Sequence, residues 1–267
     1  MSEINNSSSN HSLSGRVAVV SGGAQGIGQS IAALFQQHGA CVIILDCDAA
    51  NGQKTADFLT SRKGLAPVRF VRANLREPLE IQKAIAAVNA LHGRLNVLVN
   101  NAGVEIERSL QNVTLEDWSR VLDVNLRGPF LLVQAALPLF PGTGGAIVNI
   151  SSIHATHAFP DSIPYACSKA GMVALTRNLA LELASRHIRV NCIRPGYVDT
   201  RLWEEYLRNS PNPEALAAHT TALHPLGRRG MPVDVSEAAL FLASDSSAFI
   251  TGSDLVVDGG LTIRAHP

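Results

Sequence analysis

The sequence predicts an α/β domain built on a doubly wound parallel sheet of about seven strands, with helices on both faces. Short runs of β-branched and aliphatic residues alternate with helical segments along the whole chain. Most of these runs are apolar at every position, which is typical of strands covered on both faces. The alternation indicates parallel strands joined by right-handed crossovers, and no repeat or linker indicates a second domain.

The expected elements follow one another in order. We expect strands at residues 17–20, 41–45, 68–71, 95–99, 146–150, 189–193 and 255–257. Helices are expected at residues 27–38, 49–62, 79–92, 115–140, 165–185 and 233–243. A polar, flexible tail at residues 1–13 is expected to precede a single domain at residues 14–267. Residues 196–230 interrupt the alternation, and a segment of that length commonly forms a functional lid, here a short helical one.

The chain is poor in charge. Of its 267 residues, 46% are hydrophobic and 16% are charged, against about 25% charged residues in an average soluble domain. We therefore expect some helix faces to be buried between subunits of a homotetramer or homodimer. Lys and Arg total 22, as do Asp and Glu, so no basic excess supports nucleic-acid binding. The expected partner is a small-molecule substrate.

Signals for membrane insertion and secretion are missing from the sequence. No window approaches the roughly 18 unbroken apolar residues of a membrane span, and the first residues lack the apolar stretch of a signal peptide. The four cysteines form no CxxC pair and have no metal-ligand spacing with the histidines. We therefore expect a cytoplasmic protein with reduced thiols, no membrane contact and no bound metal.

A glycine-rich turn separates the first expected strand from the first expected helix. Its residues include Ser21, Gly22, Gln25, Gly26, Ile27 and Gly28. Glycines permit a tight turn, close approach of the backbone to a pyrophosphate, and close packing of the helix on the strand. The helix that begins here directs its free N–H groups at the phosphates. The turn therefore predicts a dinucleotide site.

Asp46 ends the second expected strand, eighteen residues after Gly28. A carboxylate at this place accepts hydrogen bonds from the adenosine ribose hydroxyls and repels a 2′-phosphate. Gln25 and Cys47 stand where an arginine or lysine for that phosphate would be expected. The pattern favours NAD(H) over NADP(H). After the fourth strand, Asn101, Ala102 and Gly103 form a turn whose small residues let the backbone pass close to the cofactor.

Three residues with fixed spacing predict the chemistry. Ser152 closes the fifth strand, and Tyr165 and Lys169 lie four residues apart on one face of the next helix. A phenol can donate a proton to a carbonyl oxygen or take one from an alcohol. Since the ordinary phenol pKa is about 10, a nearby ammonium is expected to lower it. Ser152 is expected to hydrogen-bond the substrate oxygen.

Asn125 is a fourth candidate, argued from the backbone. The sequence at Thr114 is typical of a helix N-terminus. Pro129 lacks the N–H that would bond the carbonyl four residues earlier, which belongs to Asn125. That carbonyl is therefore expected to be free, at a helix kink, to hold a water that links Lys169 to solvent.

Together these motifs resemble those of the short-chain dehydrogenase/reductase family over residues 14–260. The further matches are Pro195, Gly196, Thr200, Thr251, Gly252, Asp258, Gly259 and Gly260. The resemblance implies a Rossmann-type fold, an NAD cofactor and an oxidoreductase acting on CH–OH donors. It implies that Lys169 also binds the nicotinamide ribose, that Asn125 serves a proton relay, and that Val198 and Thr200 hold the carboxamide. It also implies tetramers or dimers built on the helices at 115–140 and 165–185.

Two places depart from the pattern of that family. Ser21 replaces the usual threonine and keeps the hydroxyl. Asn74 and Leu75 stand where an aspartate usually contacts the adenine amino group. An amide oxygen can still accept that hydrogen bond without charge, so we expect weaker adenine binding rather than its loss.

The substrate is indicated by weaker signals. The candidate pocket residues are Glu105, His154, His157, Trp203 and Glu204. Two histidines and an acid favour a hydroxyl-rich substrate, because a polar pocket must satisfy its buried groups. The stretch ending at His154 is similar to bacterial glucose dehydrogenases. The lid resembles the branch that contains L-fucose dehydrogenase and type 14 17β-hydroxysteroid dehydrogenase.

We therefore expect NAD-dependent oxidation of a secondary or hemiacetal hydroxyl on a sugar or polyol. One alternative is a reductase of 3-oxoacyl thioesters, on acyl carrier protein or coenzyme A, or of hydroxysteroids and other ketones. Another is a non-catalytic NAD(H)-binding regulator. The complete set of Ser152, Tyr165 and Lys169 argues against the regulator.

Overall fold

The computed structural model describes residues 12–264. Within them, seven strands form one parallel sheet in the order β3-β2-β1-β4-β5-β6-β7, as the sequence predicts. The strands are β1 (Val17–Ser21), β2 (Cys41–Asp46), β3 (Arg69–Arg72), β4 (Val97–Asn100), β5 (Gly145–Ile150), β6 (Ile188–Pro195) and β7 (Asp254–Val257). The strand order reverses between β1 and β4. Ligands of such sheets bind at the carboxyl ends of the strands beside this reversal.

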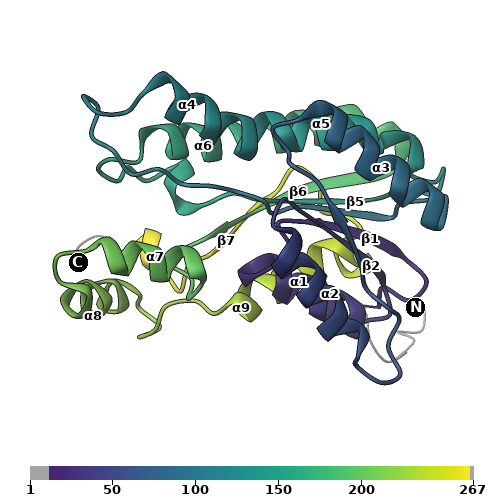
Figure 1. The fold of residues 1–267 in the computed structure, drawn as a ribbon, viewed down its shortest axis with the longest axis horizontal. Coiled ribbons are helices and arrows are strands. Elements are labelled where there is room, and N and C mark those ends of the chain that lie inside the picture. The colour runs from purple at the N-terminus through teal and green to yellow at the C-terminus, as the bar shows by residue number, and fades with distance from the viewer. Residues whose placement is uncertain (1–11, 265–267) are drawn as a thin grey trace, which may run out of the picture.

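Helices cover both faces of the sheet (Figure 1). One layer holds α1 (Gly26–Gln37), α2 (Ala49–Thr60) and α9 (Pro232–Ala243); the other holds α3 (Pro78–His92), α4 (Leu115–Leu122), α5 (Gly128–Ala136) and α6 (Ile163–Leu183). Short 3-10 turns lie at Leu137–Leu139, Ile153–Ala155, Ala184–Arg186, Asp245–Ser247 and Leu261–Ile263. Among the described residues, two apolar cores fill the two spaces between sheet and helices, the first around Phe35 and the second around Leu98.

The predicted helix at 115–140 is not continuous. It begins as expected: Thr114 Oγ1 accepts the Asp117 N–H at 3.0 Å, and the Asp117 carboxylate accepts the Thr114 N–H at 3.0 Å. A π-helical segment, Asp123–Arg127, then separates α4 from α5. In it the Gly128 N–H donates to the carbonyl of Asp123, five residues earlier. The extra residue in this turn changes which side chains face the sheet, and π-helical turns frequently lie at functional sites.

The predicted lid contains two helices, α7 (Arg201–Asn209) and α8 (Pro213–Leu223), which project beyond the carboxyl end of the sheet (Figure 1). Thr200 caps α7, because its hydroxyl accepts the Trp203 N–H at 3.4 Å. At the base of the lid, Val198 and Gly230 pair as a parallel bridge. The lid is therefore attached at both ends close to β6.

Residues 1–11 of the predicted tail lie outside the described residues. Leu13 also belongs to the expected tail, but its side chain is fully buried in the first core. Its N–H donates to the carbonyl of His38 at 2.8 Å. The packed domain thus includes Leu13, one residue before the predicted boundary at Ser14. No helix in residues 12–264 is long and apolar enough to cross a membrane.

Candidate active site

The turns after β1 and β4 are joined by one buried hydroxyl. Ser21 Oγ donates to the carbonyl of Val99 at 3.2 Å and accepts the N–H groups of Asn101 at 3.1 Å and Ala102 at 3.2 Å. Ser21 has no exposed surface. Its side chain therefore serves the expected cofactor site by holding the two turns together, and direct contact with a cofactor is left to other groups.

The glycine-rich turn is packed too tightly for side chains. Gly22 has a φ of +66°, and a Cβ there would lie 2.7 Å from the Cα of Ala102. A Cβ on Gly28 would overlap the carbonyl oxygen of Gly22 and the amide nitrogen of Asn101. That amide donates to the carbonyls of Ser21 at 3.1 Å and Gly22 at 3.0 Å. The N-terminus of α1 is thereby held against a turn that suits a pyrophosphate.

Asp46 lies beside this turn, as predicted. Its carboxylate accepts the N–H of Ala24 at 3.1 Å and the N–H of Asp48 at 3.0 Å, and the residue is partly exposed. A carboxylate held in this way can accept hydroxyl protons of a ribose. The residues at this end of the cleft fit the adenosine half of a dinucleotide.

Asn74, the residue expected to accept the adenine amino group, already has other hydrogen-bond partners. The side-chain oxygen of Asn74 accepts the backbone N–H of Arg76 at 3.1 Å. The backbone N–H of Asn74 donates to the Glu80 carboxylate at 2.9 Å. Leu75 is buried in the second core, 5% exposed. An adenine amino group would therefore share the Asn74 oxygen with the backbone.

Ser152, Tyr165 and Lys169 gather at the carboxyl end of β5, as the spacing predicts. Lys169 is buried; its ammonium donates to the carbonyl of Ile150 at 3.0 Å and lies 5.4 Å from the centre of the Tyr165 ring. Ser152 Oγ accepts the N–H of His154 at 3.2 Å, and the Ser152 side chain hydrogen-bonds the Tyr165 phenol. The Ser152 hydroxyl thus meets the Tyr165 phenol, and the Lys169 ammonium lies near the phenol ring.

The expected lowering of the Tyr165 pKa is wrong for this arrangement. Burial raises the pKa of Tyr165, the nearby Glu105 charge raises it further, and the hydrogen bond with Ser152 opposes the shift. Lys169 is not among the groups that shift this pKa; its ammonium donates to the Ile150 carbonyl, and burial lowers the pKa of Lys169 to about 8. The protein alone therefore keeps Tyr165 in its protonated form at neutral pH.

Asn125 lies in the π-helical segment and is fully buried. Its side-chain amide pairs with both backbone groups of Val104, accepting the N–H at 2.8 Å and donating to the carbonyl at 2.9 Å. It also donates to Ser168 Oγ at 3.0 Å, and Ser168 Oγ donates to the carbonyl of Tyr165 at 2.7 Å. The Asn125 side chain thus positions the loop after β4. Pro129 indicates only a free backbone carbonyl at Asn125 and does not predict this role of the side chain. The carbonyl's part in proton transfer stays a prediction.

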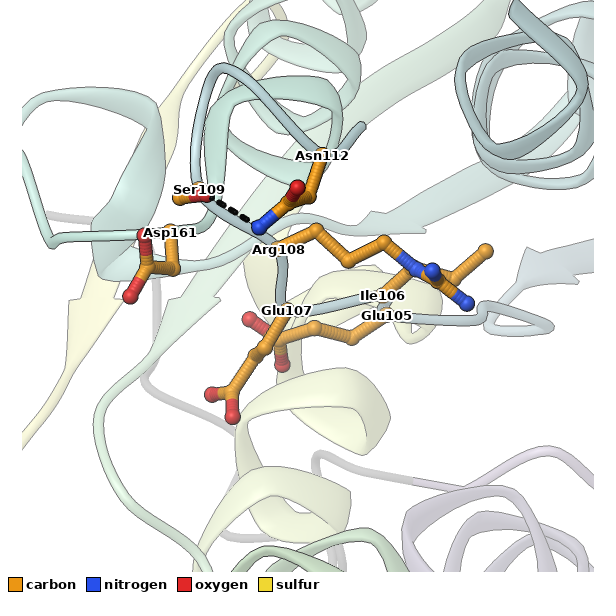
Figure 2. A pocket seen from close by; sticks show the side chains of 7 residues that line it. All are labelled: Glu105, Ile106, Glu107, Arg108, Ser109, Asn112 and Asp161. Atoms are coloured by element: carbon orange, nitrogen blue, oxygen red, sulfur yellow. Dashed lines mark hydrogen bonds between the residues drawn. The ribbon is translucent and has the colours of Figure 1, made fainter. Parts of the chain in front are cut away.

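A cavity of about 780 Å³ lies along the loop that follows β4. It is lined by Glu105, Ile106, Glu107, Arg108, Ser109, Asn112 and Asp161. Figure 2 shows the carboxylates of Glu105, Glu107 and Asp161 toward one side of the loop and the Arg108 guanidinium directed the other way. Arg108 lies 3.3 Å from Asp117. The wall next to the catalytic group is therefore acidic.

Glu105 is the innermost acid of this wall. Its carboxylate accepts a hydrogen bond from Ser162 Oγ at 3.3 Å and lies 4.0 Å from Nδ1 of His154. Burial raises the pKa of Glu105 to about 7, helped by the Glu107 charge. Burial lowers the pKa of His154 to about 4, so the imidazole is neutral at pH 7. Nδ1 of His154 is buried without a hydrogen-bond partner among the described residues.

A row of aromatic rings extends from Tyr165 to the lid. The His154 ring lies edge-on to Tyr165 at 5.1 Å and stacks on Phe159 at 4.0 Å. Tyr197 contacts Phe159 at 6.3 Å and Trp203 of α7 at 5.5 Å. The Arg229 guanidinium covers Trp203 at 4.9 Å. Trp203 is 6% exposed, so it anchors the lid and reaches the cavity through Tyr197.

The remaining predicted residues divide into two groups. Pro195 ends β6, and Gly196, Val198 and Thr200 follow it, where the nicotinamide end is expected. The Gly196 N–H donates to the carbonyl of Val257 at 3.0 Å. His157 and Glu204 are exposed. Among residues 12–264, no hydrogen bond, ion pair or ring contact joins either of these two to Glu105, His154 or Tyr165.

One residue near the glycine-rich turn, Arg201, is not predicted from the sequence. Its guanidinium Nη1 lies 3.4 Å from Oε1 of Gln25 in the glycine-rich turn. The two residues are 176 positions apart, so no local pattern could have connected them. In the part of the chain that the structure describes, His, Cys, Asp and Glu side chains form no group of three that could hold a metal ion.

Known proteins resemble the chain over nearly its whole length. The family model described as enoyl-(acyl carrier protein) reductase matches residues 22–262. An uncharacterised oxidoreductase of Thermotoga maritima is 40% identical over 94% of this chain and 98% of its own length. A 3-oxoacyl-[acyl-carrier-protein] reductase of the same organism is 36% identical over 94% and 99%. D-threitol dehydrogenase of Mycolicibacterium smegmatis is 38% identical over 94% and 95%.

A solved structure from Sinorhizobium meliloti 1021, described as a candidate short-chain alcohol dehydrogenase, has the same fold. It superposes with a TM-score of 0.88 at 32% identity and covers 96% of this chain and 100% of its own. The family model, the relatives and this structure agree with the fold. The chain therefore belongs to the short-chain dehydrogenase/reductase family and is an oxidoreductase that acts on CH–OH donors.

Proposed function

We propose that the protein is an NAD-dependent dehydrogenase that interconverts a secondary or hemiacetal alcohol of a sugar or polyol and its carbonyl. The observation that carries the substrate class is the position of Glu105 and His154 next to Tyr165. The Glu105 carboxylate is a partly exposed acceptor and Nδ1 of His154 is a buried, unpartnered nitrogen, and both lie near the reacting group. A substrate with a second hydroxyl next to the reacting carbon would satisfy both groups.

The proposed cofactor is NAD rather than NADP. The family uses nicotinamide cofactors, and the tight turn at Gly22 and Gly28 fits a pyrophosphate. Support for NAD comes from Asp46, whose carboxylate would repel a 2′-phosphate. Asp48, which follows two residues later and caps α2, adds a second negative charge on this side.

Each catalytic side chain has one task. In the direction of oxidation, a bound NAD would accept the hydride from the substrate carbon and bring a positive charge to the site. Tyr165 takes the hydroxyl proton, and Ser152 orients the substrate oxygen by hydrogen bonding. Lys169 is positioned to hold the nicotinamide ribose and to pass the proton onward. Since the protein raises the Tyr165 pKa, a positive charge in the cleft is needed to favour the phenolate.

Residues after β6 and in the lid complete the proposed site. Val198 and Thr200 would hold the carboxamide. The partly exposed rings of Phe159 and Tyr197 would pack against the apolar side of a sugar. The resemblance of the lid to the L-fucose dehydrogenase branch, and the D-threitol dehydrogenase among the relatives, are consistent with this substrate class.

A screen of NAD reduction tests the proposal. The purified protein is assayed with polyols, aldoses, hydroxysteroids and 3-hydroxyacyl thioesters, and a polyol or sugar is expected to give the highest kcat/KM. Faster oxidation of NADPH with acetoacetyl thioester would instead support the thioester-reductase alternative, to which the 3-oxoacyl-[acyl-carrier-protein] reductase relative points. The acidic wall disfavours that substrate, because the carriers of acyl thioesters bear phosphate groups.

The Tyr165→Phe variant separates an enzyme from a cofactor-binding regulator. Loss of the phenol is expected to lower kcat by about 10²- to 10⁴-fold while NADH binding persists. A regulator would keep its biological effect in this variant.

We also propose that the protein is a homotetramer. Leu115, Trp118, Phe130 and Leu181 are exposed on the α4–α6 layer. An apolar groove of about 520 Å³ lies on the same layer, between Leu126, Phe130 and Leu175. Light scattering of the purified protein measures the assembly, and a monomer would contradict the proposal.

A further inference from the structure

The side chain of Arg201 brings a positive charge from the lid to the glycine-rich turn. Its Nη1 lies 3.4 Å from Oε1 of Gln25. Hydrogen bonds from Asn51 are the main cause of a lowered pKa at Asp48, and the Arg201 charge contributes to it. Since the turn at residues 21–28 contains no lysine or arginine of its own, Arg201 is the cation that the fold supplies there.

The backbone holds Arg201 at this place. Thr200 Cγ2 lies 3.5 Å from the position that a Cβ on Gly26 would take, so the start of α7 packs against the start of α1. At the lid base, Arg229 pairs with Asp199 at 2.7 Å. Trp203, two residues beyond Arg201, is buried under the Arg229 guanidinium. Contacts on both sides of Arg201 therefore fix the position of its Cα.

The guanidinium keeps donors for an anion. Its Nε pairs with Glu205 at 2.8 Å on the same helix, and both side chains are about half exposed, at 52% and 45%. Such an exposed pair contributes little free energy. A guanidinium has five N–H donors in a planar fork that suits phosphate oxygens. The pair with Glu205 engages Nε and orients the fork toward Gln25 and the turn.

We propose that Arg201 binds the pyrophosphate of the dinucleotide from the lid. The inference rests on the proposed use of a nicotinamide dinucleotide. The pyrophosphate is favoured over a 2′-phosphate because the ribose side carries the carboxylates of Asp46 and Asp48. By contrast, Thr200, the residue before Arg201, packs against Gly26, where α1 begins and the phosphates are expected.

Binding titrations of Arg201→Gln test the proposal. Dissociation constants of NADH are measured by its fluorescence, and those of ADP-ribose and adenosine by displacement of NADH. Loss of a charged hydrogen bond to phosphate is expected to raise the Kd of NADH and of ADP-ribose by the same factor, about five- to tenfold. The Kd of adenosine, which has no phosphate, is expected to stay unchanged.

Arg208→Gln is the matched control. Arg208 lies on the same helix, is exposed, and approaches the same Glu205 at 3.9 Å, but it has no contact with the glycine-rich turn among residues 12–264. The control is expected to bind all three ligands like the unchanged protein. The inference is overturned if the two variants behave alike, or if Arg201→Gln weakens binding of NADPH alone, which would make Arg201 a 2′-phosphate ligand. If the unchanged protein does not bind NADH, the proposed function itself fails.

Discussion

The side-chain amide of Asn125 pairs with both backbone groups of Val104, at 2.8 and 2.9 Å, as one β-strand pairs with another. Val104 precedes Glu105, the acid proposed to bind the substrate. The π-helical segment that contains Asn125 therefore determines where Glu105 lies relative to Tyr165. Asn125 is therefore a positioning residue: it holds the loop that carries Glu105 against the helices α4 to α6.

Asn125→Asp tests that relationship. The variant keeps an acceptor for the Val104 N–H but replaces the donor to its carbonyl, and an unsatisfied buried group costs about 1–3 kcal/mol of folding free energy. We expect the KM for the alcohol to rise several-fold more than the Kd of NADH, because the loop at Val104 moves and the glycine-rich turn does not. Thermal unfolding and NADH titration measure both effects. Asn178→Ala, an exposed site on α6, is the control. Equal losses of alcohol and NADH binding would contradict the prediction.

Glu105 predicts the pH dependence of substrate binding. Burial raises its pKa to about 7, so the carboxylate gains its charge as the pH rises through 7 and then accepts substrate hydroxyls more strongly. We expect kcat/KM for a polyol to rise between about pH 6 and 8. In Glu105→Gln this rise is expected to disappear and KM to increase roughly tenfold. In Glu107→Gln, at the outer wall of the cavity, kcat/KM should still rise with pH. If the rise also disappears in this variant, the titrating group is not Glu105 alone.

Asp46→Asn tests the cofactor preference. The amide oxygen can still accept the N–H groups of Ala24 and Asp48 that the carboxylate holds, while the charge that repels a 2′-phosphate is removed. We expect the ratio of kcat/KM for NADP to that for NAD to rise by about tenfold or more. Steady-state kinetics with both cofactors measure the ratio. An unchanged ratio would mean that Asp46 does not select the cofactor.

Gly28→Ala tests the pyrophosphate turn. Its Cβ would overlap the Gly22 carbonyl and the Asn101 amide, and relieving this overlap must shift backbone at a cost of about 1–3 kcal/mol. We expect a lower unfolding temperature and a large loss of NADH affinity. At Gly142 a Cβ would meet no atom within 4 Å, so Gly142→Ala should leave both quantities unchanged. Normal NADH binding by Gly28→Ala would exclude this turn as the phosphate site.

The fold was predictable because its signals are local. Apolar runs and a few turn residues identify each strand, and the order of elements restricts the topology. The π-helical segment could not be predicted, because Pro129 shows that a hydrogen bond is missing but not how the helix accommodates the loss. His154 and His157 illustrate a similar limit. They are three residues apart, yet the short 3-10 turn at Ile153–Ala155 directs one ring to Tyr165 and leaves the other exposed.

Contacts between distant segments account for the other differences. The spacing of Tyr165 and Lys169 correctly places both on one face of α6. It contains no information on burial or on the nearby Glu105, which raise the pKa of Tyr165. Arg201 and Gln25 meet only because the lid folds back over the first crossover. Such contacts depend on tertiary packing, which periodicity does not encode.

The burial of Trp203 gives the lid an optical reporter. The chain has two tryptophans. Trp118 is 39% exposed on α4, whereas Trp203 is 6% exposed and lies against Tyr197 and Arg229. Tryptophan emission overlaps the absorption of reduced nicotinamide, so excitation energy can pass from the indole to a bound cofactor. With Trp118→Phe, the remaining emission reports on the lid alone, and stopped-flow recording would follow it within a single turnover.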